Sequence, residues 1–237
     1  GVTCASPPET FTITVNPAEG SVTDQDGNTY NYLTYGDQVW TLENAEMVTY
    51  RDGTPIPQVT DATEWANLTT GAWCYYENDE TKGKLYNWYA VMGIHDAIET
   101  TLNKEFAPEG WHVPSDPEWT TLENYLIANG YNYDGTTTGN KIAKAMASTT
   151  GWVSSTALGA PGNDQSINNI SGFNAFPRGI RYGYGAFGSE GYNLFGWSST
   201  GPSANNAWSY GMGVTSSNLG RGSSPKHTGC SVRFVRD

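Results

Sequence analysis

The residues best placed to do chemistry begin with the motif Pro114-Ser115-Asp116-Pro117-Glu118-Trp119. Ser115 lies three residues before Glu118, the spacing at which a hydroxyl and a carboxylate each satisfy the other's backbone N–H at the start of a helix. Asp116 and Pro117 suit the first turn, where N–H groups lack partners and negative charge is favoured. The motif therefore predicts a capped helix rather than a reactive serine.

The other acid–base residues form no recognisable catalytic or metal-binding set. The close carboxylate pairs are Asp116/Glu118, Glu43/Glu46 and Glu77/Asp79, and the histidines are His95, His112 and His227. A glycosidase needs two carboxyl groups about 5–10 Å apart across a cleft, and separated histidines match neither a Ser-His-Asp triad nor a zinc site. We expect His112 to hydrogen-bond a neighbouring loop, and we expect no catalytic residue and no metal ligand. An enzyme acting on polysaccharide is kept as an alternative.

Cys4, Cys74 and Cys230 form an odd set without a Cys-x-x-Cys motif. That spacing argues against a metal knuckle and allows at most one bridge within the chain. A Cys74–Cys230 disulfide and free buried thiols both fit the sequence, because an unpaired cysteine behaves as a small apolar residue.

The C-terminal third carries the polar and aromatic residues best suited to binding. Tyrosine gives rigid contact area and Ser and Asn give adaptable hydrogen bonds, as in antibody combining sites. The candidate ligand-binding residues are Tyr182, Tyr184, Tyr192, Asn193, Asn205, Asn206, Ser209, Ser216, Asn218 and Arg221. Long β-loops also collect turn formers for structural reasons, so the hypothesis rests on the set and not on any single residue.

Hydrophobic periodicity predicts the elements that position these residues. In the capped helix, Trp119, Leu122, Tyr125 and Leu126 recur at three- and four-residue steps and form one buried stripe, and Gly130 ends the helix. Further helical segments are expected over Lys84–Met92, over Lys141–Ala147, within Thr60–Leu68 and, in part, within His95–Phe106. Alternation predicts strands over Thr10–Val15, Thr29–Thr34, Gln38–Leu42, Trp208–Val214 and Cys230–Phe234. A turn at Gly36-Asp37 is expected to join Thr29–Thr34 and Gln38–Leu42 into a hairpin.

Strand alternation also assigns side chains to faces. Trp208, Tyr210, Met212 and Val214 are expected to be buried, with Ser209, Gly211, Gly213 and Thr215 exposed. In the last strand, Cys230, Val232 and Phe234 are expected inward, and Ser231 and Arg233 outward.

Length and charge bound the class of protein. A chain of 237 residues with 37% hydrophobic content predicts one large domain over residues 10–237, behind a tether at residues 1–9. A net charge of −12 would repel phosphate backbones and anionic lipid, so nucleic acid is not an expected partner. No apolar run approaches the roughly 20 residues that a membrane-spanning helix needs.

Several stretches together carry a family resemblance. They are Asp24–Tyr30, Gly36–Trp40, Tyr50–Pro57, Gly83–Tyr89, Gly110–Trp119, Trp197–Thr200 and Cys230–Asp237. In this order they resemble the Fibrobacter succinogenes major paralogous domain over nearly all of Val22–Asp237. The resemblance implies an α+β, C-type-lectin-like fold in which two main helices pack on a twisted antiparallel sheet and long loops of Gly179–Thr228 form the exposed site. Domains of this family are found in surface proteins of Bacteroidetes and their relatives, so the resemblance implies a surface protein. It does not imply a known ligand.

Departures from related patterns narrow the function further. The family usually has cysteines where this chain has Ala107 and Phe234, so we expect Phe234 to fill the space beside Ala107. Formylglycine-generating enzymes, which share the lectin-like fold and a motif similar to Pro114–Trp119, need a pair of C-terminal cysteines, and this chain has only Cys230 there. The Glu-Pro-Asn and Trp-Asn-Asp signatures of calcium-dependent sugar binding are absent. No cofactor is expected, and structural calcium is left open.

These observations favour a non-catalytic domain that binds a glycan or protein ligand outside the cell, as in adhesion. We expect a secreted or outer-membrane-surface lipoprotein whose targeting segment and lipid anchor would precede Gly1. One alternative is a retroelement-diversified ligand-binding protein, because the exposed positions of Asn205–Gly229 are almost all Gly, Ser, Asn, Thr, Arg or His and Gly229–Arg233 resembles the end of such variable regions. Another is a structural surface lipoprotein or fimbrial component.

Overall fold

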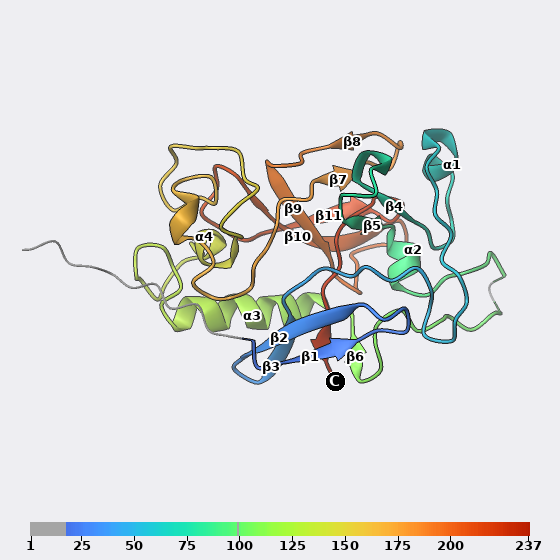
Figure 1. The fold of residues 1–237 in the computed structure, drawn as a ribbon, viewed down its shortest axis with the longest axis horizontal. Coiled ribbons are helices and arrows are strands. Elements are labelled where there is room, and N and C mark those ends of the chain that lie inside the picture. The colour runs from blue at the N-terminus through green and yellow to red at the C-terminus, as the bar shows by residue number, and fades with distance from the viewer. Residues whose placement is uncertain (1–17, 99) are drawn as a thin grey trace, which may run out of the picture.

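A computed structural model of the chain describes residues 18–98 and 100–237. The fold is α+β, with more strand than helix (Figure 1). The strands are β1 (Gly20–Thr23), β2 (Thr29–Tyr35), β3 (Gln38–Thr41), β4 (Trp73–Tyr75), β5 (Lys84–Tyr86), β6 (Trp111–His112), β7 (Ile180–Arg181), β8 (Phe187–Gly188), β9 (Asn193–Trp197), β10 (Asn206–Gly213), β11 (Gly220–Pro225) and β12 (Val235–Arg236). The helices are α1 (Ala62–Ala66), α2 (Trp88–Val91), α3 (Asp116–Ala128) and α4 (Ala143–Met146), with 3-10 turns at Tyr76–Asn78 and Gln165–Ile167. The predicted tether and the strand Thr10–Val15 lie outside the described residues.

Two antiparallel sheets dominate the architecture. The first has the order β1-β2-β3-β12-β6, so the last strand of the chain pairs with the third. The second has the order β11-β10-β9 and comes wholly from the C-terminal third. The predicted hairpin strands around Gly36 are confirmed, since β2 and β3 pair antiparallel.

Helix α3 lies between these two sheets (Figure 1). Its buried stripe is Trp119, Leu122 and Leu126. The Trp119 ring meets Trp40 of β3 edge-on at 4.8 Å and stacks on Tyr210 of β10 at 4.9 Å. The helix thus joins both sheets through one indole.

The predicted capping box at Ser115 and Glu118 is confirmed. The Glu118 carboxylate accepts hydrogen bonds from the Ser115 N–H and from the Ser115 hydroxyl, each at 2.7 Å. Pro lies in the first turn, as expected. The serine is therefore occupied in holding the start of α3.

The predicted helix Lys84–Met92 is wrong over its first half. Lys84–Tyr86 is strand β5, paired antiparallel with β4, and only Trp88–Val91 is helical. Asn87 separates the two, because its side-chain oxygen accepts the N–H groups of Ala72 and Ala90. Residues 18–98 and 100–237 therefore contain one long helix, α3, and not the two main helices that the sequence predicts.

Two of the three shorter helical predictions are confirmed and one is wrong. The helical turn around Trp65 is confirmed as α1, and the segment Lys141–Ala147 contains α4. The described residues of His95–Phe106 contain bends and turns but no helix. Its apolar residues Ile98 and Leu102 are 64% and 87% exposed, so no packing face supports a helix there.

Strand alternation predicts burial only in part. Tyr210, Met212 and Val214 are buried, but Trp208 is half-buried and Ser209 is buried. In the last segment Cys230, Val232 and Phe234 are buried as expected, whereas Ser231 and Arg233 are also buried instead of facing outward. Both sides of this central segment are covered, so alternation does not distinguish an inner from an outer face.

Arg233 shows how a charged residue is accommodated there. Its guanidinium donates to the carbonyls of Thr41 and Phe173 at 2.9 and 3.1 Å and to the Asn44 side-chain oxygen at 2.6 Å. Burial lowers the pKa of Arg233 to about 10, which leaves it protonated at neutral pH. The side chain therefore cross-links loops from the inside.

Cys74 and Cys230 are free, buried thiols and form no disulfide. Phe234 and Ala107 are both buried and belong to the same hydrophobic core cluster. The Phe234 ring also contacts Tyr30 edge-on at 5.7 Å. Apolar packing holds this region together.

Candidate functional site

A groove of about 430 Å³ lies on the outer face of the sheet β9-β10-β11. It is lined by Asn193, Phe195, Ser209, Gly211, Met212, Gly213, Thr215, Ser216, Asn218, Gly220, Arg221 and Gly222. No Asp, Glu or Lys lines it, although the chain carries a net charge of −12. The lining is therefore uncharged except for one arginine.

Glycines form the floor of the groove. Gly211 of β10 pairs with Phe195 of β9 on one side and with Gly220 of β11 on the other, so these residues form a row across the sheet. A Cβ on Gly211 would lie 2.4 Å from the Leu194 carbonyl oxygen, whereas a Cβ on Gly222 would have nothing closer than 3.8 Å. The floor is low because side chains are absent, and Phe195 stands at its end.

The opposite face of the same sheet is packed. Leu194, Tyr210 and Met212 are buried in the core cluster that contains Trp119 of α3. The helix thus supports the sheet from below and leaves the groove face open. This difference between faces positions the candidate site.

The structure divides the sequence-predicted binding residues into groups. Asn193, Ser209, Ser216, Asn218 and Arg221 come together in the groove. The remaining candidates lie outside its lining and are Tyr182, Tyr184, Tyr192, Asn205 and Asn206. Of these, Tyr192 adjoins the groove, because its carbonyl accepts the N–H of Val214 at the end of β10.

Two of the groove residues serve the sheet as well. Ser209 is 5% exposed, and its hydroxyl lies 3.0 Å from that of Ser224 across the strands. The Ser216 hydroxyl donates to the side-chain oxygen of Asn218. No hydrogen bond of the Asn193 side chain occurs among the described residues, so its amide is free to meet a ligand.

Arg221 is less available than the sequence suggests. Its Nε and one NH2 group donate to the two carboxylate oxygens of Asp116 at 2.5 and 2.7 Å, and its guanidinium lies 3.5 Å from the centre of the Trp208 ring. The hydrogen bond to Asp116 raises the pKa of Arg221. Burial alone would raise the pKa of Asp116, but the hydrogen bonds from Arg221 and Tyr210 lower it. The pair is neutral overall and ties β11 to the start of α3.

Tyr182 and Tyr184 form a separate aromatic patch between β7 and β8. Their rings are stacked with centroids 5.3 Å apart, and Tyr184 is 70% exposed. A Cβ on Gly183 would lie 2.3 Å from the His227 ring, so that ring covers the backbone between the tyrosines. The patch offers flat aromatic surface away from the groove.

The acid–base residues near α3 are engaged with one another. His112 lies between Glu118 and Asp237, at 2.6 Å from Glu118 Oε1 and 2.7 Å from Asp237 Oδ1. The hydrogen bond to Glu118, followed by that to Asp237, raises the pKa of His112 to about 9 against the effect of burial. Burial alone would raise the pKa of Glu118, but hydrogen bonds from His112 and Ser115 lower it to about 2. The partners of His112 are thus the carboxylates of Glu118 and Asp237, one on each ring nitrogen. We call this arrangement the His112 clamp.

The carboxylate pair Glu43/Glu46 lines another hollow, of about 410 Å³. Glu43 accepts the Asn31 N–H at 2.7 Å, and Glu46 accepts from Lys84 Nζ at 3.1 Å. Each carboxylate therefore has a donor from the protein. The hydrogen bonds of Glu43 and Glu46 thus give them a structural role, and their geometry does not favour acid–base catalysis.

Possible cation ligands are likewise satisfied by protein donors. Asp24 accepts hydrogen bonds from the backbone N–H groups of Asp26 and Asn28 and from the Tyr30 hydroxyl at 2.6 Å. Within residues 18–98 and 100–237 there is no cluster of three or more His, Cys, Asp or Glu side chains suited to a metal ion. The sequence motif Asp24–Tyr30 is a tight turn with its own hydrogen bonds.

The sequence analysis did not predict Phe195 or the glycine floor as parts of the site. Gly at alternate positions of two neighbouring strands, Gly211/Gly213 and Gly220/Gly222, was the available signal. It indicates a sheet face without side chains once the strand pairing is known. The pairing itself is a tertiary property.

None of the helices in the described part of the chain is both long enough and apolar enough to cross a bilayer. No curated protein and no solved structure matches the chain. The family model of the Fibrobacter succinogenes major domain matches residues 33–236, which include the three-stranded sheet, most of the five-stranded sheet, α3 and the groove. The chain therefore belongs to the Fibrobacter succinogenes major domain family.

Proposed function

We propose that this domain is a non-catalytic recognition module, of C-type-lectin-like fold, that binds a glycan or protein ligand in the groove on β9-β10-β11. The observation that carries the proposal is the collection of amide, hydroxyl and aromatic groups over a glycine floor, on the open face of a sheet whose other face is packed on α3. Such groups bind neutral polar surfaces, because they donate and accept hydrogen bonds without the desolvation cost of charge.

The chemistry of the groove suits a ligand better than a substrate. Its lining has no carboxylate or histidine, and the carboxylates elsewhere that we considered accept hydrogen bonds from protein groups. General acid–base catalysis needs a titratable group within hydrogen-bond reach of the reacting atom. The groove supplies positioning groups instead.

We place the domain at the outer surface of the cell, as a lipoprotein or secreted protein. The excess of Asn, Thr, Ser and Gly over charged residues, which make up 15% of the chain, supports this location. A net charge of −12 opposes binding to nucleic acid. The ligand would then be a glycan or a protein met outside the cell.

The test compares two double variants on a glycan array and in pull-downs from surface-protein extracts. Asn193→Ala/Asn218→Ala removes amides from the groove without removing core volume, and we expect it to lose most of the binding shown by the wild type. Tyr182→Ala/Tyr184→Ala is the matched control, since it removes one half-buried and one exposed ring, both outside the groove lining. Equal binding by the wild type and the groove variant, with loss in the tyrosine variant, would move the site to the β7–β8 patch.

A retroelement-diversified binding protein is a second candidate, favoured by one observation. The segment Asn205–Gly229, whose exposed residues are mostly Gly, Ser, Asn, Thr and Arg, supplies β10, β11 and most of the groove lining. Diversification of this segment would change the ligand and preserve the sheet. A reverse transcriptase gene with a template repeat beside the coding sequence would support it, and their absence would argue against it.

A further inference from the structure

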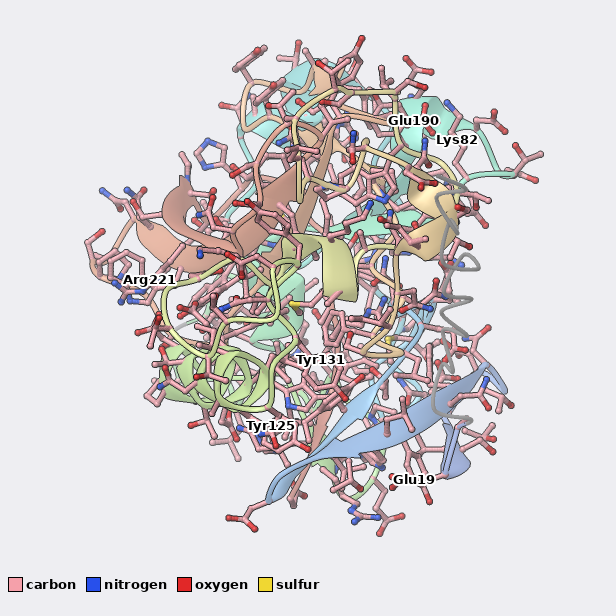
Figure 2. The ribbon with its side chains drawn as sticks, turned by 90° about the vertical axis from the view of Figure 1, so that its left-hand side faces the viewer. Glu19, Lys82, Tyr125, Tyr131, Glu190 and Arg221 are labelled. Carbon is pink, nitrogen blue, oxygen red and sulfur yellow. The ribbon has the colours of Figure 1, made fainter. Side chains whose placement is uncertain are left out.

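Strand β11 forms an outer edge of the three-stranded sheet. Among the described residues the order β11-β10-β9 leaves β11 with one neighbour, and Arg221, Gly222, Ser223 and Pro225 are exposed. The other edge of this sheet is covered, because Ser231 donates its N–H to the Phe195 carbonyl at 3.0 Å. Figure 2 shows Arg221 at the margin of the molecule.

The strand register fixes which backbone groups point outward. Lys226 donates its N–H to the Asn205 carbonyl at 3.0 Å, and the same register pairs Ser224 with Ala207 and Gly222 with Ser209. Hydrogen-bonded and non-bonded pairs alternate in an antiparallel ladder. Gly222 and Ser224 therefore face β10, while the N–H and C=O groups of Arg221 and Ser223 point away from the sheet.

This edge lacks the features that usually prevent pairing. Natural edge strands carry lysines, inward charges or bulges that keep another strand away. The segment Gly220–Ser224 has no Lys, Asp or Glu, and its one charge, on Arg221, is paired with Asp116. Only Pro225, at the strand's end, limits how far pairing can extend.

We propose that β11 pairs antiparallel with β11 of a second copy of this chain, around a two-fold axis at Gly222. In this register the outward N–H and C=O of Arg221 face those of Ser223 in the other copy, and the symmetry repeats the pair. The donors and acceptors match one for one. Glycine at the axis permits the close backbone approach of a non-bonded pair, and a continuous sheet forms from both copies.

The symmetry has a consequence for binding. Residues opposite each other in a ladder share a face, so both glycine-floored grooves open on the same side of the joined sheet. Gly220 and Gly222 belong to both the groove lining and the edge strand, so the two grooves adjoin the seam. A repetitive ligand could then occupy both, which raises avidity without a new contact.

The charge and size of the interface set its strength. A single strand pair buries less surface than a stable interface of about 1,200–2,000 Å², so we expect a weak dimer. Each copy carries a net charge of −12, so the copies repel each other. Raising the ionic strength from about 0.01 to 0.15 M shortens the screening length from about 30 to 8 Å, and should tighten the dimer.

The test is sedimentation equilibrium of the whole chain over a wide concentration range at low and physiological salt. Ser223→Pro removes an outward N–H that β10 does not use, and we expect it to lose the dimer and keep the wild-type unfolding midpoint. Ser223→Ala keeps the N–H and should dimerise like the wild type.

Two results would overturn the proposal. A wild-type chain that stays monomeric at every concentration and salt would assign the edge to another partner or to none. A dimer that survives in Ser223→Pro, with the fold intact, would place the contact on a different surface. Ligand binding by the groove is measured separately on the monomeric variant, so failure of the dimer leaves the proposed recognition function standing.

Discussion

The two main sheets of this domain use the same antiparallel pairing for different ends. The five-stranded sheet meets α3 and the core through large rings such as Trp40 of β3 and Phe234 just before β12, both fully buried. The outer face of the three-stranded sheet instead carries Gly211, Gly220 and Gly222. Side-chain volume stabilises the first, and its absence creates a binding surface on the second.

The groove on the three-stranded sheet depends on the packing of the sheet's opposite face. Glycine weakens a strand, because it has no side chain to pack and loses more backbone entropy on folding. The inner face compensates with Tyr210 and Met212, buried against Trp119. Packing on the opposite face therefore stabilises a sheet whose groove face carries few side chains.

The strongest test of this contrast truncates an aromatic residue in the packed region. Phe234→Ala should lower the free energy of unfolding by about 3–5 kcal/mol, because removing a fully buried ring leaves a cavity in the core. Urea unfolding followed by tryptophan fluorescence measures this. An unchanged midpoint would show that the ring does not support the core, and Leu102→Ala, at an 87% exposed position, is the control that should change little.

A second test adds a methyl group to the groove floor at two places. Gly211→Ala should cost about 1–3 kcal/mol, since overpacking forces the backbone apart and its Cβ would lie 2.4 Å from the Leu194 carbonyl oxygen. Gly222→Ala has room and should stay within about 0.5 kcal/mol of the wild type. Equal midpoints for the two variants would contradict the assigned strand pairing.

The cap of α3 should matter less than either core or floor. Ser115→Ala removes one side of the capping box and should cost about 1 kcal/mol in unfolding free energy. It should leave ligand affinity unchanged, because Ser115 is not part of the groove lining. A variant that kept its stability but lost binding would show that the start of α3 contacts the ligand.

The smallest expected effect is the pH dependence of the His112 clamp. The pKa of His112 rises from 6.5 to about 9 on folding, so its contribution is full below pH 6.5 and is lost as pH rises through about 9. That of Glu118 falls from 4.5 to about 2, so its contribution is present above pH 4.5 and is lost as pH falls through about 2. Since His112 is 40% exposed, solvent should limit the effect to below about 1 kcal/mol. Thermal melts of wild type and His112→Gln between pH 6 and 10 would show it, and identical slopes would refute it.

Local patterns predicted what local physics controls. The capping box, three of the four residues in the buried stripe of α3 and the hairpin at Gly36 were predicted correctly, because each depends on neighbours within a few residues. Tyr125, the fourth residue of the stripe, is half-buried. The prediction of a helix over Lys84–Met92 was wrong in its first half, because the Asn87 side-chain oxygen accepts the N–H of Ala72. The fold brings Ala72 close to Asn87. Burial of Ser231 and Arg233 was missed for the same reason.

The groove was predicted only as a list of residue types. Asn193, Ser209, Ser216, Asn218 and Arg221 meet because β9, β10 and β11 pair in one register. The same tertiary contacts remove Arg221 from free binding by pairing it with Asp116, a residue of the capped motif. Sequence spacing contains no information on that ion pair.

Motif order, periodicity and composition were enough to predict the family, the capped helix and the chemical character of the C-terminal third. The three-dimensional contacts were needed to establish which polar residues share a groove, which are engaged in the protein's own hydrogen bonds, and which strand edge has no partner among the described residues. The physical reason is that hydrogen-bond satisfaction and burial depend on distances between segments far apart in the chain.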